Sequence, residues 1–176
     1  ALYPEDPSLA EKLELATFRW RLERVPPHAA AVVGRPEISR AEFATLLFWT
    51  VPSLRSAQSE AGQIASDILE HPRREEIVRV LNLGVMDVAD PALRSFEPDR
   101  PLARGDALAS LLRLARLLGQ PACLAAAPPE LGRAAACEYG VRCGLLADAD
   151  ACLPSTAVSG EEALEGIRRV LGLAGG

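Results

Sequence analysis

Long apolar runs are missing from this sequence of 176 residues. No stretch approaches the roughly 18 consecutive apolar residues that a transmembrane helix requires. The start also lacks a basic segment followed by an apolar one, the pattern of a secretory signal. Because the chain begins with Ala1 and not with Met, we expect a processed protein or a fragment. The sequence predicts no membrane-spanning segment.

Positive charge is also scarce. The chain has 19 Lys and Arg residues against 24 Asp and Glu, which gives a net charge of −5 at pH 7. A general nucleic-acid-binding protein needs a basic surface that displaces counterions from phosphates, so this class is excluded. The hydrophobic fraction of 49% is ordinary for a globular chain. At this length we expect one domain or a compact row of small repeats.

Recognisable catalytic motifs are absent. The two histidines, His28 and His71, each stand beside a proline near an expected helix boundary, where a surface or capping role is the favoured interpretation. The sequence contains no nucleophile elbow, phosphate-binding loop, dinucleotide fingerprint or EF-hand loop. We therefore predict a non-catalytic protein without a metal site or cofactor.

The cysteines are few and gathered in one stretch: Cys123, Cys137, Cys143 and Cys152. Their spacing lacks the close pairs of a structural zinc site. Four cysteines allow three disulfide pairings, among which the sequence does not choose. The alternative is four free thiols in a helical core, because unpaired cysteine is often buried. Export would favour at least one disulfide.

Helical periodicity dominates what is present, so the predicted fold class is all-α. Ser8 and Ser39 each stand three residues before a Glu, which is the capping-box pattern of a helix start. Pro26, Pro52 and Gly84 are helix terminators. The predicted helices span residues 8–24, 39–51, 72–83, 104–118, 129–142 and 160–171, with a polar connector at 53–66 and loops at 86–103 and 147–159.

Three of the predicted helix starts share one pattern. They read Ile38-Ser39-Arg40-Ala41-Glu42, Leu102-Ala103-Arg104-Gly105-Asp106 and Val158-Ser159-Gly160-Glu161-Glu162. Each has an apolar residue, a small or hydroxyl residue, Arg or Gly, and an acidic residue in the first turn. The spacing between these starts is the length of one helix–loop–helix unit, so we predict an internal repeat.

The middle unit resembles the S-layer homology family. It contains four elements of that repeat in order: Ser66-Asp67-Ile68, Leu83-Gly84-Val85, Phe96-Glu97-Pro98 and Ala103-Arg104-Gly105-Asp106. The resemblance implies three helix–loop–helix repeats packed as a pseudo-trimer. The corresponding organisation is an N-terminal helix and linker (1–34), a first repeat with its connector (35–65), a second repeat (66–120) and a third repeat (121–176).

The resemblance also implies a ligand site. In the family, the motif Arg and the groove between repeats hold an anionic cell-wall sugar, a role that only Arg40 and Arg104 match here, near Glu42 and Asp106. Glu42 and Asp106 also have a purely structural reason to exist, because acidic residues favour a helix N-terminus. An Arg beside a helix N-terminus is electrostatically unfavourable for the helix itself, so Arg40 and Arg104 each need a partner outside their own helix. That partner is either an internal carboxylate or loop carbonyl, or an anionic ligand.

Two departures from the family pattern favour a protein partner over a sugar. Gly160 stands where a third Arg would be, and Pro72 stands where the family often has Trp. Trp20 and the aromatics of the first unit are expected mainly in the core, with Trp49 the best candidate for exposure. The predicted contact patch consists of Phe48, Trp49, Val51 and Leu54.

The leading hypothesis is therefore a non-catalytic scaffold module that makes protein–protein contacts in a bacterial cell envelope, in the periplasm or outside the cell. The alternative is anchoring to cell-wall polysaccharide or a peptidoglycan-linked polymer. The first 25 residues, with the turn Tyr3-Pro4-Glu5-Asp6 and an amphipathic helix, resemble the end of a tetratricopeptide-type array, which would suit a larger scaffold.

Overall fold

The computed structural model describes residues 7–59, 62, 64–148 and 152–174. The turn Tyr3-Pro4-Glu5-Asp6 lies outside these residues. Within them the structure is all-α: helices alternate with loops, and β-structure is limited to three isolated bridges. The α-helices are α1 (Pro7–Leu22), α2 (Pro27–Val33), α3 (Arg40–Thr50), α4 (Pro52–Ser56), α5 (Arg74–Asn82), α6 (Arg104–Gly119), α7 (Arg133–Arg142) and α8 (Gly160–Ala174).

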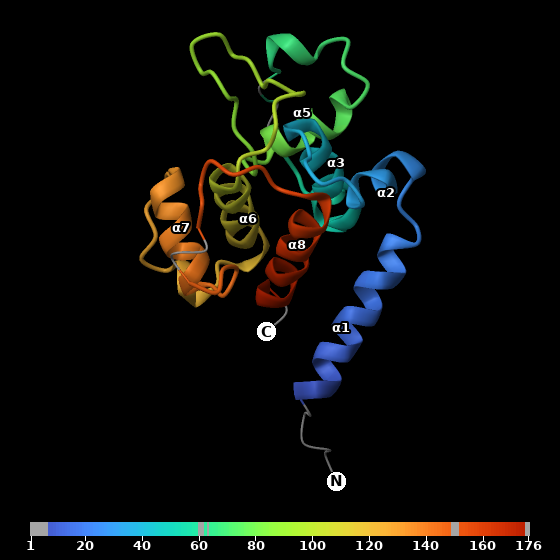
Figure 1. Ribbon diagram of the computed structural model, residues 1–176, viewed down its shortest axis with the longest axis vertical. Coiled ribbons are helices and arrows are strands. Elements are labelled where there is room, and N and C mark those ends of the chain that lie inside the picture. The colour runs from blue at the N-terminus through green and yellow to red at the C-terminus, as the bar shows by residue number, and fades with distance from the viewer. Residues whose placement is uncertain (1–6, 60–61, 63, 149–151, 175–176) are drawn as a thin grey trace.

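Three helices, α3, α6 and α8, lie side by side in the body of the molecule, while α1 extends away from it (Figure 1). Helix α5 packs on α3, and α7 packs on α6. The buried side chains between these helices form one continuous core, which includes Phe43, Leu47, Ile77, Leu112 and Ile167. All five are fully buried. The core therefore joins all three predicted units.

A closed ring of backbone hydrogen bonds joins the segments just before the three central helices. The amide of Ile38 donates to the carbonyl of Val158 (3.0 Å), that of Val158 to Leu102 (3.1 Å), and that of Leu102 to Ile38 (2.9 Å). All three side chains are buried. Each of the three segments therefore donates to one neighbour and accepts from the other.

The helices that precede α6 and α8 end in the same way. Gly84 and Gly144 both have positive φ, 66° and 70°, a conformation that glycine adopts at little cost. In each case the next two residues donate to one carbonyl, that of Val80 after α5 and that of Gly140 after α7. Each of these helices also follows a short 3₁₀ turn, η1 (Ser66–Ile68) and η2 (Ala122–Leu124).

Asp67 in η1 ties that turn to the loop before α6. Its carboxylate accepts hydrogen bonds from the amides of Phe96 (2.8 Å) and Glu97 (2.7 Å) and from the hydroxyl of Ser95 (2.7 Å). Burial opposes ionisation, but these hydrogen bonds outweigh it and lower the pKa of Asp67.

Several predicted boundaries are wrong, and prolines explain most of the errors. Residues Pro27–Val33 form α2 and Pro52–Ser56 form α4, where the sequence analysis placed a helix end and a connector. Each proline occupies the first turn, where it has no intrahelical hydrogen bond to lose. The starts predicted at residues 72 and 129 move to Arg74 and Arg133.

Candidate functional site

Arg40, the first motif arginine, is a buried structural residue. Its guanidinium donates to the carbonyl oxygens of Phe96 (2.8 Å) and Asp87 (2.5 Å) and lies over the Phe96 ring. Only 5% of the residue is exposed, and burial lowers the pKa of its guanidinium. Arg40 thus attaches α3 to the loop of the second unit through donors that are bonded to carbonyl oxygens. The sequence-predicted internal partner is confirmed here.

The second motif arginine, Arg104, also has an internal partner. Its Nη2 lies 2.8 Å from Oε1 of Glu162 at the start of α8. Glu162 accepts from the amide of Ser159 and its own amide bonds the Ser159 hydroxyl, so the two residues form a capping box. Burial works against ionisation of Glu162, but its hydrogen bonds to Ser159 and its pairing with Arg104 lower the pKa.

The two acidic residues predicted with these arginines are engaged as well. Glu42 is buried, completes the capping box with Ser39, and pairs with Arg35 at 2.5 Å. Asp106 accepts two hydrogen bonds from Arg133, at 2.8 and 3.0 Å, which raise the pKa of Arg133. The four residues Arg40, Glu42, Arg104 and Asp106 therefore link helix starts to neighbouring segments, and Arg40 and Asp106 also line one cavity together.

Gly160 has a physical reason to replace the third arginine. A Cβ atom built on Gly160 would lie 2.0 Å from the carbonyl oxygen of Val32 and 2.6 Å from that of Val33. The Gly160 amide donates to the carbonyl of Arg35 (2.9 Å), which fixes this close approach. Because the end of α2 fills the space, no side chain fits at the start of α8.

The predicted partner-contact patch does not form a surface. Val51 and Leu54 are fully buried in the core, and Phe48 is only 7% exposed. Trp49 is partly buried, with its Nε1 3.3 Å from Oε1 of Glu76. The prediction was wrong because α4 folds back after Val51 and brings Leu54 inside. The aromatic residue with large exposure is Trp20, at 51%, which had been expected in the core.

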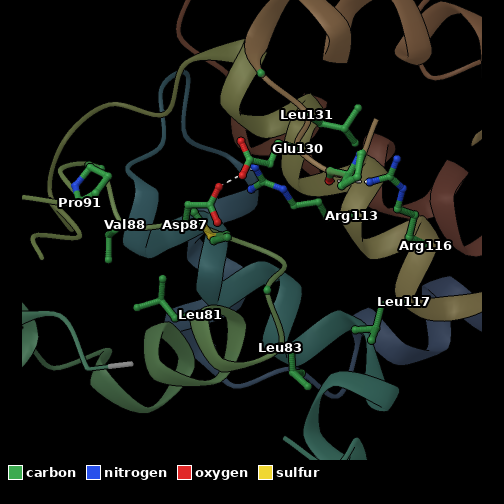
Figure 2. A pocket seen from close by; sticks show the side chains of 15 residues that line it. Leu81, Leu83, Asp87, Val88, Pro91, Arg113, Arg116, Leu117, Glu130 and Leu131 are labelled. Carbon is green, nitrogen blue, oxygen red and sulfur yellow. Dashed lines mark hydrogen bonds and ion pairs between the residues drawn. The ribbon is translucent and has the colours of Figure 1, made fainter. Parts of the chain in front are cut away.

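An open groove lies instead between α6 and the loops on either side of it (Figure 2). Its volume is about 870 Å³, within the range of ligand-binding pockets. Its apolar lining comes from Leu81, Leu83, Met86, Val88, Leu117 and Leu131. Leu117 is 43% exposed, whereas Leu81, Met86 and Leu131 belong to the buried core.

The cations of this groove already have partners. Nη2 of Arg113 lies 2.5 Å from Oδ2 of Asp87. Arg116 donates to the carbonyls of Ala127 (3.0 Å), Pro128 (2.6 Å) and Pro129 (2.9 Å). An incoming anion would have to compete with these bonds, whereas an apolar side chain could occupy the groove without breaking them. The groove therefore combines apolar contacts with the charged groups of Asp87, Arg113, Arg116 and Glu130.

A smaller cavity of about 310 Å³ adjoins the groove and shares Asp87, Arg113 and Leu131 with it. It is lined by more charged groups, including Arg100 and Arg133. Both of these approach Asp106, Arg100 at 3.5 Å. The sequence analysis missed the groove, whereas two of its predicted site residues, Arg40 and Asp106, line the smaller cavity. Arg113, Arg116 and Leu117 stand three and four residues apart, so they share one helix face, and that spacing was the available signal.

All four cysteines form disulfides, which the sequence analysis left open against free thiols. Cys123 pairs with Cys143, and Cys137 pairs with Cys152. The first bond ties η2 to the end of α7, and the second ties α7 to the loop before α8. No thiol is thus available as a nucleophile or metal ligand.

The histidines contact carboxylates. Nε2 of His28 lies 3.4 Å from Glu76, and Nε2 of His71 lies 3.8 Å from Asp99. Among the residues that the structure describes, no group of three or more His, Cys, Asp or Glu side chains could hold a metal ion.

Within the described ranges no helix combines the length and apolarity needed to cross a membrane. No protein-family model matches this sequence, and no curated protein is significantly similar to it.

Proposed function

We propose that this protein is a non-catalytic scaffold module of the bacterial cell envelope that binds a segment of a protein partner. The observation that carries the proposal is the groove beside α6, which presents apolar side chains beside arginines that are bonded to internal groups. A groove of this kind accepts apolar side chains of a peptide segment, because such side chains need no donors from the protein.

We further propose that the fold consists of three S-layer-homology-like repeats around a pseudo-threefold axis. The ring of hydrogen bonds through Ile38, Leu102 and Val158 supports this arrangement, as do the matching glycine ends of α5 and α7. The two disulfides support an exported location, because such bonds persist in oxidising compartments.

The test is capture of partners from an envelope extract by the whole chain. Leu117→Asp places a charge in the groove and should abolish capture. The matched control is Leu93→Asp, because Leu93 is 69% exposed and does not line the groove. Capture that survives Leu117→Asp would refute the proposed site, and capture lost in both variants would show that the effect is nonspecific.

The second candidate function is anchoring to an anionic cell-wall polymer. Arg100, Arg113 and Arg133 around the smaller cavity favour it, because guanidinium groups bind anionic oxygens in pairs. Co-sedimentation with purified sacculi tests this function. If Arg113→Gln abolishes sedimentation while Leu117→Asp leaves every protein partner bound, the anchoring function replaces the scaffold function.

A further inference from the structure

The groove and the smaller cavity follow one face of α6. Ala109, Arg113 and Leu117 stand four residues apart on this helix, so they share one face. Ala109 lines the smaller cavity, Leu117 lines the groove, and Arg113 lines both. At a rise of about 1.5 Å per residue, the distance along the helix from Ala109 to Leu117 is roughly 12 Å. The smaller cavity therefore continues the groove along the same helix.

The two aspartates of the smaller cavity pair with three of its four arginines. Nη2 of Arg113 lies 2.5 Å from Oδ2 of Asp87, and Figure 2 shows both side chains in the groove lining. Asp106 accepts two hydrogen bonds from Arg133, and Nη2 of Arg100 lies 3.5 Å from the same carboxylate. The side chains of Arg100 and Arg133 are 39% and 48% exposed, so solvent reaches the cavity.

Arg40 is the fourth arginine of this cavity, and it is buried. Its Nε and Nη2 donate to carbonyl oxygens, those of Phe96 and Asp87, which carry no net charge. The remaining carboxylate nearby, that of Glu97, lies 2.7 Å from Nη1 of Arg100. Burial, and after it the charge of Arg100, lower the pKa of Arg40. The four arginines thus face three carboxylates, and a further anion in the cavity would stabilise the buried cation.

We propose that the groove and the smaller cavity together bind an extended segment of a protein partner that carries both an apolar and an acidic side chain. The apolar side chain lies against Leu117, and the carboxylate lies among the four arginines. An extended chain advances about 3.3 Å per residue, so the two side chains are three or four residues apart. The inference rests on the proposed function, because it names the chemistry of the segment that the groove binds.

A protein segment fits this arrangement better than an anionic polysaccharide does. Either ligand could supply an anionic group to the guanidinium groups of the smaller cavity. The adjoining groove, however, offers the apolar side chains of Leu83, Pro91 and Leu117, and Leu117 is 43% exposed. A chain of anionic sugars has no apolar side chain to place against them, whereas a peptide with a leucine or phenylalanine has one.

The first experiment selects peptides from a random display library on the whole chain. We expect the enriched peptides to carry Asp or Glu three or four positions from Leu, Ile or Phe. Selection on Arg100→Gln should keep the apolar preference and lose the acidic one, because this variant removes one positive charge from the cavity. Selection on Leu117→Asp should lose the apolar preference. Arg142→Gln is the matched control, because Arg142 is 48% exposed and lines neither cavity.

The second experiment measures, by fluorescence anisotropy, the affinity of one enriched peptide and of the same peptide with its acidic residue changed to the amide. The parent chain should bind the amide peptide about tenfold more weakly, which is the loss of one hydrogen-bonded charge. The Arg100→Gln variant should bind the two peptides with equal affinity.

The outcomes separate this inference from the proposed function. Enriched peptides that are apolar without an acidic preference, or equal binding of both peptides by the parent chain, overturn the inference and leave the proposed function standing. A parent chain that enriches no peptide overturns both. Acidic peptides that bind Leu117→Asp as well as they bind the parent chain overturn the inference in favour of an anion site that does not use the groove.

Discussion

Arginine side chains join segments that are distant in this sequence. Arg79 donates to the carbonyls of Leu54, Arg55 and Ala57, and Arg116 donates to three carbonyls of the loop before α7. A guanidinium presents five donors in a fixed plane, whereas a lysine ammonium offers a single point of charge. Lysine is nearly absent from the sequence, and this agrees with the structure, because several loops are held by guanidinium groups that each donate to more than one carbonyl.

Removing Arg40 should destabilise the protein more than removing Arg104. Arg40→Ala leaves one buried and one partly buried carbonyl without their guanidinium donors, so we expect the free energy of unfolding to fall by about 3 kcal/mol. Arg104→Ala breaks an ion pair with a half-exposed carboxylate and should cost about 1 kcal/mol or less. Denaturant unfolding of the two variants measures the difference, and equal losses would contradict the internal role of Arg40.

Glu165 in α8 makes stability depend on pH in the acid range. Hydrogen bonds from Arg168, and after it Arg169, lower the pKa of this carboxyl from 4.5 to about 2. A lowered pKa stabilises the folded state above pH 4.5, and this stabilisation is lost as the pH falls through about 2.

Glu165→Gln should therefore destabilise the protein at neutral pH, by at most about 1 kcal/mol, because the side chain is 44% exposed and solvent weakens its ion pairs. The difference between variant and parent should shrink as the pH falls from 4.5 towards 2. Thermal unfolding across that range measures it, and a difference that is constant with pH would contradict the assignment.

At the scale of elements, the second and third units stabilise the same layout by different means. In the second unit, Ile77 of α5 and Phe96 of the following loop are fully buried. The third unit instead joins α7 and its following loop through the Cys137–Cys152 disulfide. In the second unit, Asp67 in η1 binds the loop before α6. In the third unit, Cys123 in η2 instead forms a disulfide with Cys143 at the end of α7.

The third unit should consequently be the part sensitive to reductant. The two bonds close loops of 20 and 15 residues, and each stabilises the fold by about 3 kcal/mol if it acts by restricting the unfolded chain. We expect a lower melting temperature with dithiothreitol and no such shift in a variant with all four cysteines replaced by Ser. Alkylation should modify no cysteine before reduction and all four after it.

Individual helices were predictable because their signals are local. The capping box at Ser39, the predicted helix start at Gly160 and Gly84 at the end of a helix place three boundaries within a residue or two. The short helices α2 and α4 were missed, because each starts with a proline that equally well ends the preceding helix. Whether such a proline ends one helix or begins the next depends on how the neighbouring segments pack, and not on the proline itself.

At the scale of the whole molecule, the packing of α2 against α8 links the two ends of the chain. The carbonyls of Val32 and Val33 lie so close to Gly160 that the start of α8 accepts only glycine. Gly160→Ala should lower the free energy of unfolding by roughly 2–3 kcal/mol, because the added methyl group displaces backbone. Gly119→Ala is the control, since nothing lies within 4 Å of the added atom. It should be neutral or slightly stabilising. Equal melting temperatures for the two variants would contradict this packing.

The sequence by itself determined the helical class, the helix starts at residues 104 and 160 and the capping box at Ser39, because these depend on contacts within a few residues. It also restricted the arginines of the motif to two positions. Only the tertiary structure decided where those arginines point, which cysteines pair, and that Val51 and Leu54 lie inside while Trp20 lies outside. The groove beside α6 was likewise decided at that level, because its walls come from three separate segments, 81–91, 113–117 and 129–132, whose approach depends on the packing of the whole core.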